Sequence, residues 1–585
     1  MPLTRGKPKL LAEELLGEEH QPSVETARGL TFEVMRAYWG SLADGDSLRP
    51  LEDFGLDLVP ASEHLIDRLW ALGRAVARLS PLEASFEVGR MYMALLPKGY
   101  RSSHGIYFTP PPLADRLLQL ASASGIDLAA ARVLDPACGG GAFLAPVAAA
   151  KLDALADHPP DRVLARICAT VRGLEIDPFS AWLSQVFLEA VLFPVSRGAD
   201  RDLPVLVEVC DALQLDEHAA YDLIVGNPPY GRVKLNPRQR ERFQRSLFGH
   251  ANLYGLFTDL ALRLADTGAA VAFVTPTSFL SGQYFRNLRQ LLAELAPPSR
   301  LEFISDRNGV FDDVLQEALL AVYRAGEGRG EGRARLLKVG PSGNFEVDDV
   351  GTFVLPAEPS APWIIPRRRE HAALVKAAQQ QPTRLADLGY RVSTGPLVWN
   401  RHKDQLRSEP GRGRYPLIWA EAVTAAGRFE FRAEKKNHEP YFEVRPERDD
   451  WLMIRRPCVL LQRTTSKEQR RRLIAAELAA SFLDEHGAAV VENHLNMIYP
   501  AEGPLISPVV PARTIAALLN SRVADDLFRC ISGSVAVSAF ELEALPLPAA
   551  GALEKLDRLL DAGTTPDEID SFLRAAYRDE VAAAA

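Results

Sequence analysis

The sequence has few cysteines, and their spacing offers neither a disulfide framework nor a metal site. The five include no Cys-x-x-Cys pair and leave one without a partner: Cys138, Cys168, Cys210, Cys458 and Cys530. Structural disulfides or a zinc knuckle would need paired, closely spaced cysteines. We therefore expect a reducing compartment and no metal in the functional site.

Long apolar runs are also missing. The chain has no stretch of about 18 apolar residues, the length that crosses a bilayer. The first thirty residues mix lysine and glutamate without an apolar centre, unlike a signal peptide. We expect a cytoplasmic protein with no membrane partner.

Extremes of composition are absent as well. Hydrophobic residues make up 47% and charged residues 24% of the 585 residues, which is typical of a soluble globular protein with large buried cores. Disorder, collagen and a coiled coil are thereby excluded. At roughly 150 residues per domain, the length indicates two to four domains. The net charge of −9 argues against a protein that coats nucleic acid with its whole surface.

Hydrophobic periodicity divides the chain into regions. Apolar residues recur at helical spacing between 63 and 96, whereas 101–324 alternates short β-rich runs with helical stretches. The expected strands are 132–135, 171–176, 205–209, 222–226, 269–275 and 318–323. This alternation indicates an α/β fold with a doubly wound, mostly parallel sheet.

Glycine- and proline-rich segments indicate the domain boundaries. We expect an N-terminal helical region at 1–100, the α/β domain at 101–330, a connection at 331–385, a mixed α+β domain at 386–550 and a helical tail at 551–585.

The first motif with chemical content is a glycine-rich turn. Residues 133–144 read VLDPACGGGAFL, so that a strand ends at Asp135 and three glycines lead into a helix. Glycine lets the backbone approach a ligand closely and adopt positive φ. A dinucleotide-binding fingerprint would have a further glycine where Leu144 stands, which argues against a dehydrogenase.

Acidic residues follow the next two strands. Glu175, at the end of the second strand, suits a carboxylate that accepts hydrogen bonds from both ribose hydroxyls of a nucleoside cofactor. Asp211, at the end of the third, has the position of an acceptor for an adenine amino group. Either acid alone would be read as a helix cap or a loop residue. Their order along one sheet favours a nucleoside site.

The most specific motif is DLIVGNPPY at 222–230. An apolar strand delivers Asn227 to its carboxyl edge, where open α/β sheets bind ligands, and Pro228 and Pro229 stiffen the turn. The Asn227 side-chain oxygen and the Pro228 carbonyl can accept the two protons of an exocyclic amine and aim its lone pair at an electrophile. Tyr230 supplies a stacking face. The motif predicts chemistry on the amine of an adenine ring.

From about 105 to 323, the motifs and their order resemble the gamma-class, TaqI-like DNA adenine N6-methyltransferases. GIYFTPP at 105–111 is similar to the family's cofactor-carboxylate motif, NLYGLF at 252–257 and VTPTSFL at 274–280 match its pattern, and NPPY is similar to its catalytic motif. The resemblance implies a seven-stranded, Rossmann-like methyltransferase sheet and S-adenosyl-L-methionine as cofactor. Ala212 and Val314 depart from residues that some members have at the pocket rim.

The resemblance also assigns roles to residues. It implies cofactor contacts by Thr109, Pro110, Asp135, Pro136, Ala137, Gly139, Gly141, Glu175, Ile176, Asp211, Ala212, Asn227 and Phe257. It implies a catalytic group of Asn227, Pro228, Pro229, Tyr230 and Phe311, with Phe311 as the second aromatic wall. The implied reaction methylates N6 of an adenine that has been flipped out of duplex DNA. Cys138 is expected to pack in the turn, without a nucleophilic role.

Basic residues near the motifs are candidates for DNA contact. We expect phosphate contacts by Arg232 and Lys234, directly after NPPY, and by Arg463, Lys467, Arg470, Arg471 and Arg472. The segments 392–401, 461–467, 492–496, 520–522 and 532–534 resemble the target-recognition region of related methyltransferases. We therefore expect the 386–550 region to be a DNA target-recognition domain.

The sequence thus predicts a site-specific DNA adenine methyltransferase of a restriction-modification or similar defence system. It would associate with the nucleoid through double-stranded DNA, with a cognate restriction endonuclease as a further expected partner. The alternatives are a bifunctional enzyme that also cuts DNA, a methyltransferase acting on RNA or a protein glutamine, and a non-catalytic DNA-binding subunit. The first hundred residues lack an acid followed by Glu-x-Lys, which argues against cleavage.

Overall fold

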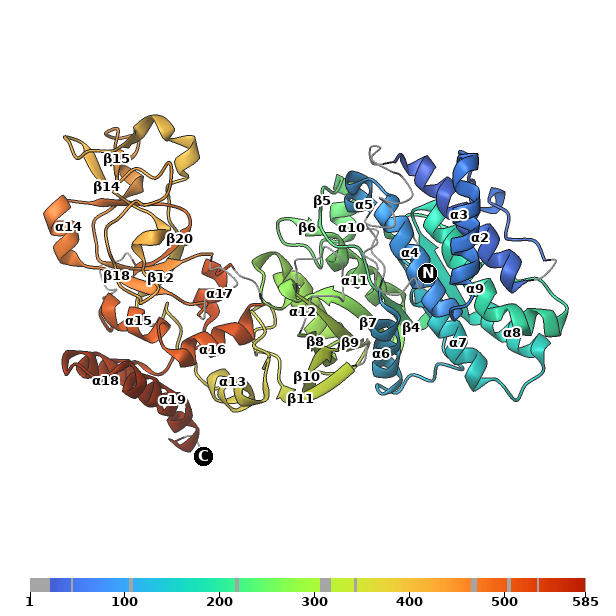
Figure 1. The fold of residues 1–585 in the computed structure, drawn as a ribbon. Coiled ribbons are helices and arrows are strands. Elements are labelled where there is room, and N and C mark those ends of the chain that lie inside the picture. The colour runs from blue at the N-terminus through green and yellow to red at the C-terminus, as the bar shows by residue number, and fades with distance from the viewer. Residues whose placement is uncertain are drawn as a thin grey trace. The chain divides into compact units, whose positions relative to one another are not determined.

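The computed structural model describes residues 22–43, 46–104, 109–215, 220–305, 317–340, 345–464, 471–501, 507–533 and 536–583. The chain divides into two compact units (Figure 1). Unit 1 comprises Met1–Pro276 and Asn287–Asp348, and unit 2 comprises Thr277–Arg286 and Asp349–Ala585.

Unit 1 is built on a nine-stranded sheet in the order β11-β10-β8-β9-β7-β4-β1-β2-β3. Its strands are β1 (Val133–Asp135), β2 (Val171–Glu175), β3 (Val207–Val209), β4 (Tyr221–Gly226), β7 (Ala265–Pro276), β8 (Pro298–Ile304), β9 (Ala318–Arg324), β10 (Gly332–Val339) and β11 (Phe345–Phe353). Neighbours from β3 to β7 pair in parallel, as do β8 and β10, whereas β9 is antiparallel to β7 and β8. The expectation of a mostly parallel α/β sheet is confirmed.

The strand count differs from the seven that the family resemblance implies. Strands β10 and β11 lie in or beside the segment 331–385, where we expected a connection, and they extend the sheet beyond β8. In β10, GRARLLKV, the buried Ala334 and Leu337 are interspersed with charged residues. Such a mixed pattern suits a strand near a sheet edge, but it lacks the continuous apolar run from which the inner strands were predicted.

Helices alternate with the strands of unit 1. They are α6 (Pro111–Ser122), α7 (Leu144–Ala154), α8 (Pro160–Thr170), α9 (Pro178–Ala199), α10 (Pro237–Arg242), α11 (Leu253–Leu264) and, starting at the last residue of unit 2's short segment, α12 (Arg286–Leu295). Among the described residues, only α9 is long and apolar enough to cross a membrane by length and composition. Since 72% of its apolar window is buried in the protein, α9 is a core helix.

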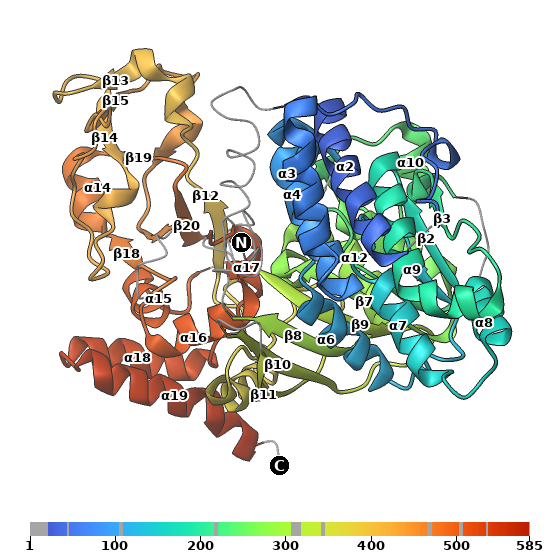
Figure 2. The same cartoon turned by 45° about the vertical axis from the view of Figure 1, so that its right-hand side comes forward.

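The N-terminal helices pack beside α9. They are α2 (Val24–Leu42), α3 (Glu63–Val76), α4 (Pro81–Leu95) and α5 (Lys98–His104). Figures 1 and 2 show α2 and α4 next to α9. The Phe32 and Trp182 rings are 5.6 Å apart, and the Tyr92 and Phe179 rings 4.9 Å apart. The helices and the sheet therefore share one apolar core.

Unit 2 contains two smaller sheets. The four-stranded antiparallel sheet has the order β12 (Tyr390–Thr394), β20 (Leu495–Pro500), β17 (Cys458–Gln462), β18 (Ala475–Leu478). The five-stranded sheet has the order β13 (Leu406–Arg407), β15 (Tyr441–Glu443), β14 (Arg414–Ile418), β19 (Ala489–Val491), β16 (Met453–Ile454). Unit 2 thus combines strands and helices.

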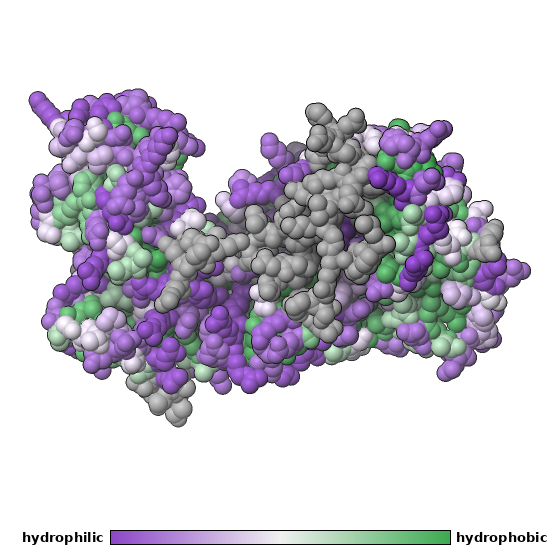
Figure 3. Space-filling view, viewed as in Figure 1, coloured by the Kyte–Doolittle hydropathy of each residue, from purple (hydrophilic) through white to green (hydrophobic). Residues whose placement is uncertain are grey.

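The helices of unit 2 are α13 (Ala372–Gln379), α14 (Ala480–His486), α15 (Ala512–Leu519), α16 (Arg522–Ile531), α17 (Ala539–Ala544), α18 (Ala550–Asp561) and α19 (Pro566–Ala583). Leu553 of α18 and Tyr577 of α19 are fully buried in the same apolar cluster as α15 and α16. The C-terminal helices are thus part of the core of unit 2. On the face drawn in Figure 3, the described surface is mostly hydrophilic, with small hydrophobic areas.

Candidate active site

The acids and the asparagine singled out in the sequence follow neighbouring strands of the large sheet. Asp135 ends β1, Glu175 ends β2 and Asn227 follows β4. Because β1 pairs in parallel with both β2 and β4, all three lie at one edge. The strand order reverses its direction between β1 and β4, and open α/β sheets bind ligands at such a switch point.

The turn after β1 has backbone conformations that favour glycine. Gly139 and Gly141 have φ values of +52° and +89°. The turn is held against β2, since the Cys138 amide donates to the Leu174 carbonyl oxygen at 3.0 Å. Without side chains at the glycines, a ligand can approach the outer backbone of the turn.

Asp135 is a buried carboxylate with unused hydrogen-bonding capacity. Its Oδ1 accepts from the Ala137 amide at 3.1 Å, whereas its Oδ2 has no partner among the described residues. Gly226 makes room for it, because a Cβ there would lie 2.7 Å from Oδ1. Burial raises the pKa of Asp135 well above its usual range, and the nearby Glu175 carboxylate adds to this. A cationic ligand would oppose the shift.

Glu175 accepts three backbone hydrogen bonds. Its Oε2 receives the Gly139 amide, and its Oε1 receives the amides of Ile176 and Asp177, all at 2.9 Å. Burial raises the pKa of Glu175 to about 7, although these amides oppose the shift. Ile176 beside it is 52% exposed. An exposed apolar side chain next to a buried acid offers both kinds of contact that a nucleoside needs.

Asp211 reaches the same edge of the sheet but is engaged locally. Its carboxylate caps a short 3-10 helix, η2 (Ala212–Gln214), and accepts from the Leu213 amide at 3.1 Å and the Gln214 side chain at 2.8 Å. Ala212 and Phe257 are both buried. A role for Asp211 toward an adenine amine therefore stays a prediction.

Asn227 is held at both ends of its amide. Its Nδ2 donates to the Thr109 hydroxyl at 3.1 Å, and its Oδ1 accepts from the Tyr230 hydroxyl at 2.7 Å. Thr109 is buried, and Pro110 after it is the N-cap of α6. The side-chain oxygen of asparagine has two lone pairs. One of them thus remains for a further donor.

The loop that carries Tyr230 is supported from several sides. The Tyr230 hydroxyl also lies 3.2 Å from the Val274 carbonyl oxygen, and the Tyr254 ring meets the Tyr230 ring edge-on at 6.1 Å. After the motif, β5 (Arg232–Val233) pairs with β6 (Ala251–Asn252). No role for Tyr254 was predicted from the sequence, where only its place in NLYGLF at 252–257 marks it. Phe311 and residues 105–108 lie outside the described residues.

The basic run after Tyr230 has an exposed part and an internal part. Arg232 and Lys234 are exposed. Arg245, further along, pairs with the buried Asp259 at 2.6 Å, and Arg242 donates to the Leu215 carbonyl oxygen. The end of the run therefore stabilises unit 1, and its beginning faces solvent beside the NPPY loop.

The part of the chain that the structure describes contains no cluster of three or more His, Cys, Asp or Glu side chains suited to a metal ion. Burial also raises the pKa of the Cys138 thiol well above its usual range. A protonated, enclosed thiol is a poor nucleophile, which agrees with a packing role for Cys138.

In unit 2, three segments expected to recognise DNA meet. The Arg463 amide donates to the His494 carbonyl oxygen at 2.9 Å, and the Asn493 amide donates to the Leu397 carbonyl oxygen at 3.0 Å. The segments 392–401, 461–464 and 492–496 therefore converge at the ends of β12, β17 and β19.

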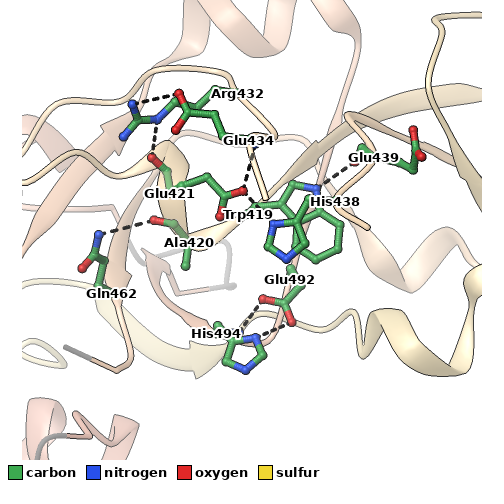
Figure 4. Close-up of polar contacts among 10 residues, drawn as sticks. All are labelled: Trp419, Ala420, Glu421, Arg432, Glu434, His438, Glu439, Gln462, Glu492 and His494. Atoms are coloured by element: carbon green, nitrogen blue, oxygen red, sulfur yellow. Dashed lines mark hydrogen bonds and ion pairs between the residues drawn. The ribbon is translucent and has the colours of Figure 1, made fainter. Parts of the chain in front are cut away.

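Carboxylate–imidazole pairs fix side chains in this region (Figure 4). His494 Nδ1 lies 2.7 Å from Glu492 Oε1, and the imidazole is 61% exposed whereas the Glu492 side chain is 1% exposed. His438 Nδ1 lies 2.6 Å from Glu421 Oε1, and its ring stacks on Trp419 at 3.7 Å. Of the two imidazoles, His494 is the one presented to solvent in a fixed orientation.

Two arginines expected to contact DNA make contacts within unit 2. Arg471 donates to the carbonyl oxygens of Asn520 at 2.5 Å and Ala425 at 3.0 Å. The Arg472 amide donates to Asp525 Oδ1 at 2.5 Å. These bonds tie the segment after β17 to Ala425, to the end of α15 and to α16. Lys467 and Arg470 lie outside the described residues.

The doubly wound sheet and the residues at its edge define the chain as an α/β protein with a candidate ligand site at a topological switch point. Residues 196–311 match the family described as Eco57I restriction-modification methylase. The type II methyltransferase M.BsuBI of Bacillus subtilis is 27% identical over 341 residues, 57% of this chain and 66% of that protein. M.PstI of Providencia stuartii is 27% identical over 361 residues, 60% of this chain and 70% of that protein. The chain carries an Eco57I-type restriction-modification methylase domain.

Solved structures agree on the fold. The type IIL restriction-modification enzyme MmeI, solved in complex with DNA, has a TM-score of 0.52 at 15% identity, covering 98% of this chain and 90% of that chain. The DrdV–DNA complex has a TM-score of 0.50 at 12% identity, covering 95% of this chain and 69% of that chain. At such low identity, these similarities concern the fold alone.

Proposed function

We propose that the protein is a site-specific DNA adenine N6-methyltransferase that uses S-adenosyl-L-methionine. The observation that carries this proposal is the Asn227 amide, held between Thr109 and Tyr230 at the sheet edge that also bears Asp135 and Glu175. An amide fixed in this way is an oriented acceptor for an amine, and the two acids beside it suit a cationic nucleoside.

The residues at the ends of β1 and β2 fit this cofactor. The unpartnered Asp135 Oδ2 and the glycine turn would accommodate the methionine part, with Thr109 and Pro110 beyond them. Glu175 would accept from the ribose hydroxyls, and Ile176 would cover the adenine. The cofactor supplies a methyl group on a sulfonium. Pro136, Ala137, Gly139, Gly141, Asp211, Ala212 and Phe257 complete the proposed cofactor site.

Asn227 would act on the target amine. Its Oδ1 keeps a lone pair after accepting from Tyr230, and the Pro228 carbonyl offers a second acceptor. Together they would hold the two N–H groups of N6 and direct its lone pair out of the ring plane. Pro229 keeps the turn rigid. No covalent bond between the protein and the base is needed.

An adenine in duplex DNA can reach this edge only after leaving the base stack. Stacking on Tyr230, and on Phe311 as the proposed second wall, would offset the cost by about 1–3 kcal/mol for each ring. The Tyr254 ring contacts the Tyr230 ring in a T-shaped arrangement. The exposed Arg232 and Lys234 would hold phosphates next to the flipped nucleotide.

We further propose that the strand ends of unit 2 form the target-recognition surface. Arg463 and His494 belong to its converging segments. The basic residues that follow Arg463 in the chain are Lys467, Arg470, Arg471 and Arg472. In this proposal the protein is the modification enzyme of a restriction-modification or similar system, works in the bacterial cytoplasm on nucleoid DNA and has a cognate restriction endonuclease as partner. The similarity to the type II methyltransferases M.BsuBI and M.PstI supports the modification activity in this proposal.

The test is methylation of unmodified plasmid DNA by the purified full-length protein with labelled cofactor, followed by sequencing of the modified bases. We expect N6-methyladenine in one short sequence context and none with Asn227→Ala, which should still bind the cofactor. Label on RNA or on protein glutamine instead of DNA would contradict the proposed substrate. DNA cleavage in the same tubes would identify a bifunctional enzyme.

A further inference from the structure

The N-terminal helices reach the proposed cofactor site beside Glu175. Arg28 on α2 donates from Nη2 to Asp177 Oδ1 at 2.7 Å, and Tyr100 on α5 donates to the same oxygen at 2.8 Å. Arg28 Nη2 also lies 3.1 Å from the Tyr100 hydroxyl. Two residues from outside the sheet therefore converge on one buried carboxylate that follows β2.

Asp177 transmits this contact to the site. Its amide donates to Glu175 Oε1 at 2.9 Å, and its Oδ2 accepts from both the amide and the hydroxyl of Ser180 at 2.8 Å, in the first turn of α9. The side chain of Asp177 is fully buried, and that of Arg28 is 16% exposed. Asp177 is thus fixed by two helices and a tyrosine, and its amide in turn orients Glu175.

We propose that Arg28 and Tyr100 are positioning residues for the cofactor: by fixing Asp177, they hold Glu175 in the orientation that receives the ribose of S-adenosyl-L-methionine. This inference rests on the proposed function and extends it to the N-terminal helices. Neither residue needs to touch the cofactor. Their effect passes through the backbone between Glu175 and Asp177.

A second contact supports a functional role for these helices. Ser85 on α4 donates to the carbonyl oxygen of Gly140 at 3.0 Å, within the glycine turn. A small cavity between α4 and the turn is lined by Ser85, Phe86, Thr109 and Gly141. The N-terminal helices thus contact the site after β1, through Ser85, and after β2, through Arg28 and Tyr100. Ser85 lines the same small cavity as Thr109, which accepts a hydrogen bond from Asn227.

Packing of the helices does not require the Arg28–Asp177 pair. Rings on α2 and α4 already contact α9, through Phe32 with Trp182 and Tyr92 with Phe179. A buried ion pair adds little net stability, because desolvation of both charges offsets their attraction. What the pair adds is a defined orientation of Asp177, and that orientation matters at Glu175.

Cofactor affinity tests the proposal. The full-length protein and its Arg28→Met, Arg28→Lys and Tyr100→Phe variants would be titrated with S-adenosyl-L-methionine by calorimetry, well below their unfolding temperatures. We expect Kd to rise about tenfold in Arg28→Met, for the loss of one oriented charge-assisted contact, and less in the two conservative variants. Arg36→Met is the matched control, since Arg36 lies on the same helix but pairs with Glu33 at 3.1 Å. Its Kd should stay within about twofold of wild type.

The pH dependence of Kd separates positioning from support of the fold. The Asp177 amide lowers the pKa of Glu175. If this amide is displaced in Arg28→Met, the pKa of Glu175 should rise, and the weakening of cofactor binding at low pH should begin at a higher pH than in wild type. A merely structural role would lower Tm and leave both Kd and its pH profile as in wild type, which would overturn the proposal. If Arg28→Met does not fold, the double variant Arg28→Met, Asp177→Asn removes both buried charges and should show the same weakened binding.

The wild-type titration distinguishes failure of the proposed function from failure of the role of Arg28. Wild-type protein that binds no S-adenosyl-L-methionine would overturn the proposed function together with this inference. Wild-type binding matched by equally tight binding of Arg28→Met would overturn only the role of Arg28 and leave the proposed function intact.

Discussion

The Tyr230 hydroxyl lies 2.7 Å from Oδ1 of Asn227, so that the aromatic ring and the amide of one motif are fixed together. From the other side, the Thr109 hydroxyl accepts a hydrogen bond from Nδ2 of Asn227 at 3.1 Å. In this arrangement Oδ1 accepts from Tyr230 and Nδ2 donates to Thr109. A carboxamide turned by half a rotation would offer a donor where an amine needs an acceptor. The proposed chemistry of Asn227 therefore depends on these hydroxyls.

Replacing Thr109 with valine keeps the side-chain volume and removes the acceptor for Nδ2. We expect kcat to fall about 10- to 100-fold, since an unpaired buried amide group costs about 1–3 kcal/mol. Steady-state methylation assays and cofactor titration would measure the effect, with Thr109→Ser as the control that keeps the hydroxyl. If Thr109 served mainly as a cofactor contact, KM for the cofactor would rise and kcat would persist.

Tyr230 should separate stacking from hydrogen bonding. Tyr230→Phe keeps the ring and loses the bond to Asn227, for which we expect a loss in kcat of up to about tenfold, in line with about 1 kcal/mol for one hydrogen bond. Tyr230→Ala also loses the stacking face, worth about 1–3 kcal/mol, and should be impaired much further. Fluorescence of 2-aminopurine at the target position would report flipping. Equal flipping in both variants would argue against the stacking role.

The inner strands were predictable because they are short apolar runs bounded by glycine, proline or acid. The runs expected at 222–226 and 269–275 correspond to β4 and β7. Strands β8, β10 and β11 were not predicted, since charged and apolar residues mix along them, as Arg300 and Glu302 do in β8. A strand toward the end of a sheet needs fewer apolar residues, so its sequence resembles that of a loop.

The site was predictable where its residues follow strands and not where distant segments meet. The motif around Asn227 and the acids Asp135 and Glu175 occur at strand ends, and parallel strands bring such ends to one edge. The Arg28–Asp177 contact joins positions 149 apart in sequence, and neither residue lies in a motif that names its partner. Only the packing of α2 against α9 creates that contact.

The pH dependence of cofactor binding should follow Glu175, whose pKa burial raises to about 7. Only the ionised carboxylate accepts from both ribose hydroxyls, so affinity for S-adenosyl-L-methionine should increase as pH rises through about 7. Calorimetry between pH 6 and 8 would measure this dependence. Below the pKa of Glu175, we expect the affinity to change on the order of tenfold per pH unit. Glu175→Gln should bind more weakly and show no such limb; a limb that survived in this variant would assign the titration to another group.

Stability without cofactor should depend on pH in the opposite direction. The folded-state pKa of Glu175 lies above its usual 4.5, so the folded protein binds the proton more tightly than the unfolded chain does. This contribution is fully present below pH 4.5 and is lost as pH rises through about 7. Chemical denaturation of wild type and Glu175→Gln in cofactor-free buffer would isolate it. A difference between the two proteins that stayed constant over this window would contradict the shift.

DNA contact beside the site should depend on the exposed start of the basic run. Each phosphate contact contributes about 0.9 to the slope of log K against log salt concentration. Arg232→Ala combined with Lys234→Ala should therefore reduce that slope by about 2 and weaken binding to all duplex sequences alike. Fluorescence anisotropy at several salt concentrations measures both quantities.

The matched control is Arg74→Ala, because Arg74 is exposed in the last turn of α3, away from the motifs. Cofactor affinity should stay unchanged in every variant, since none of these side chains lies among the proposed cofactor contacts. A slope unaltered in the double variant would remove this part of the run from the DNA interface.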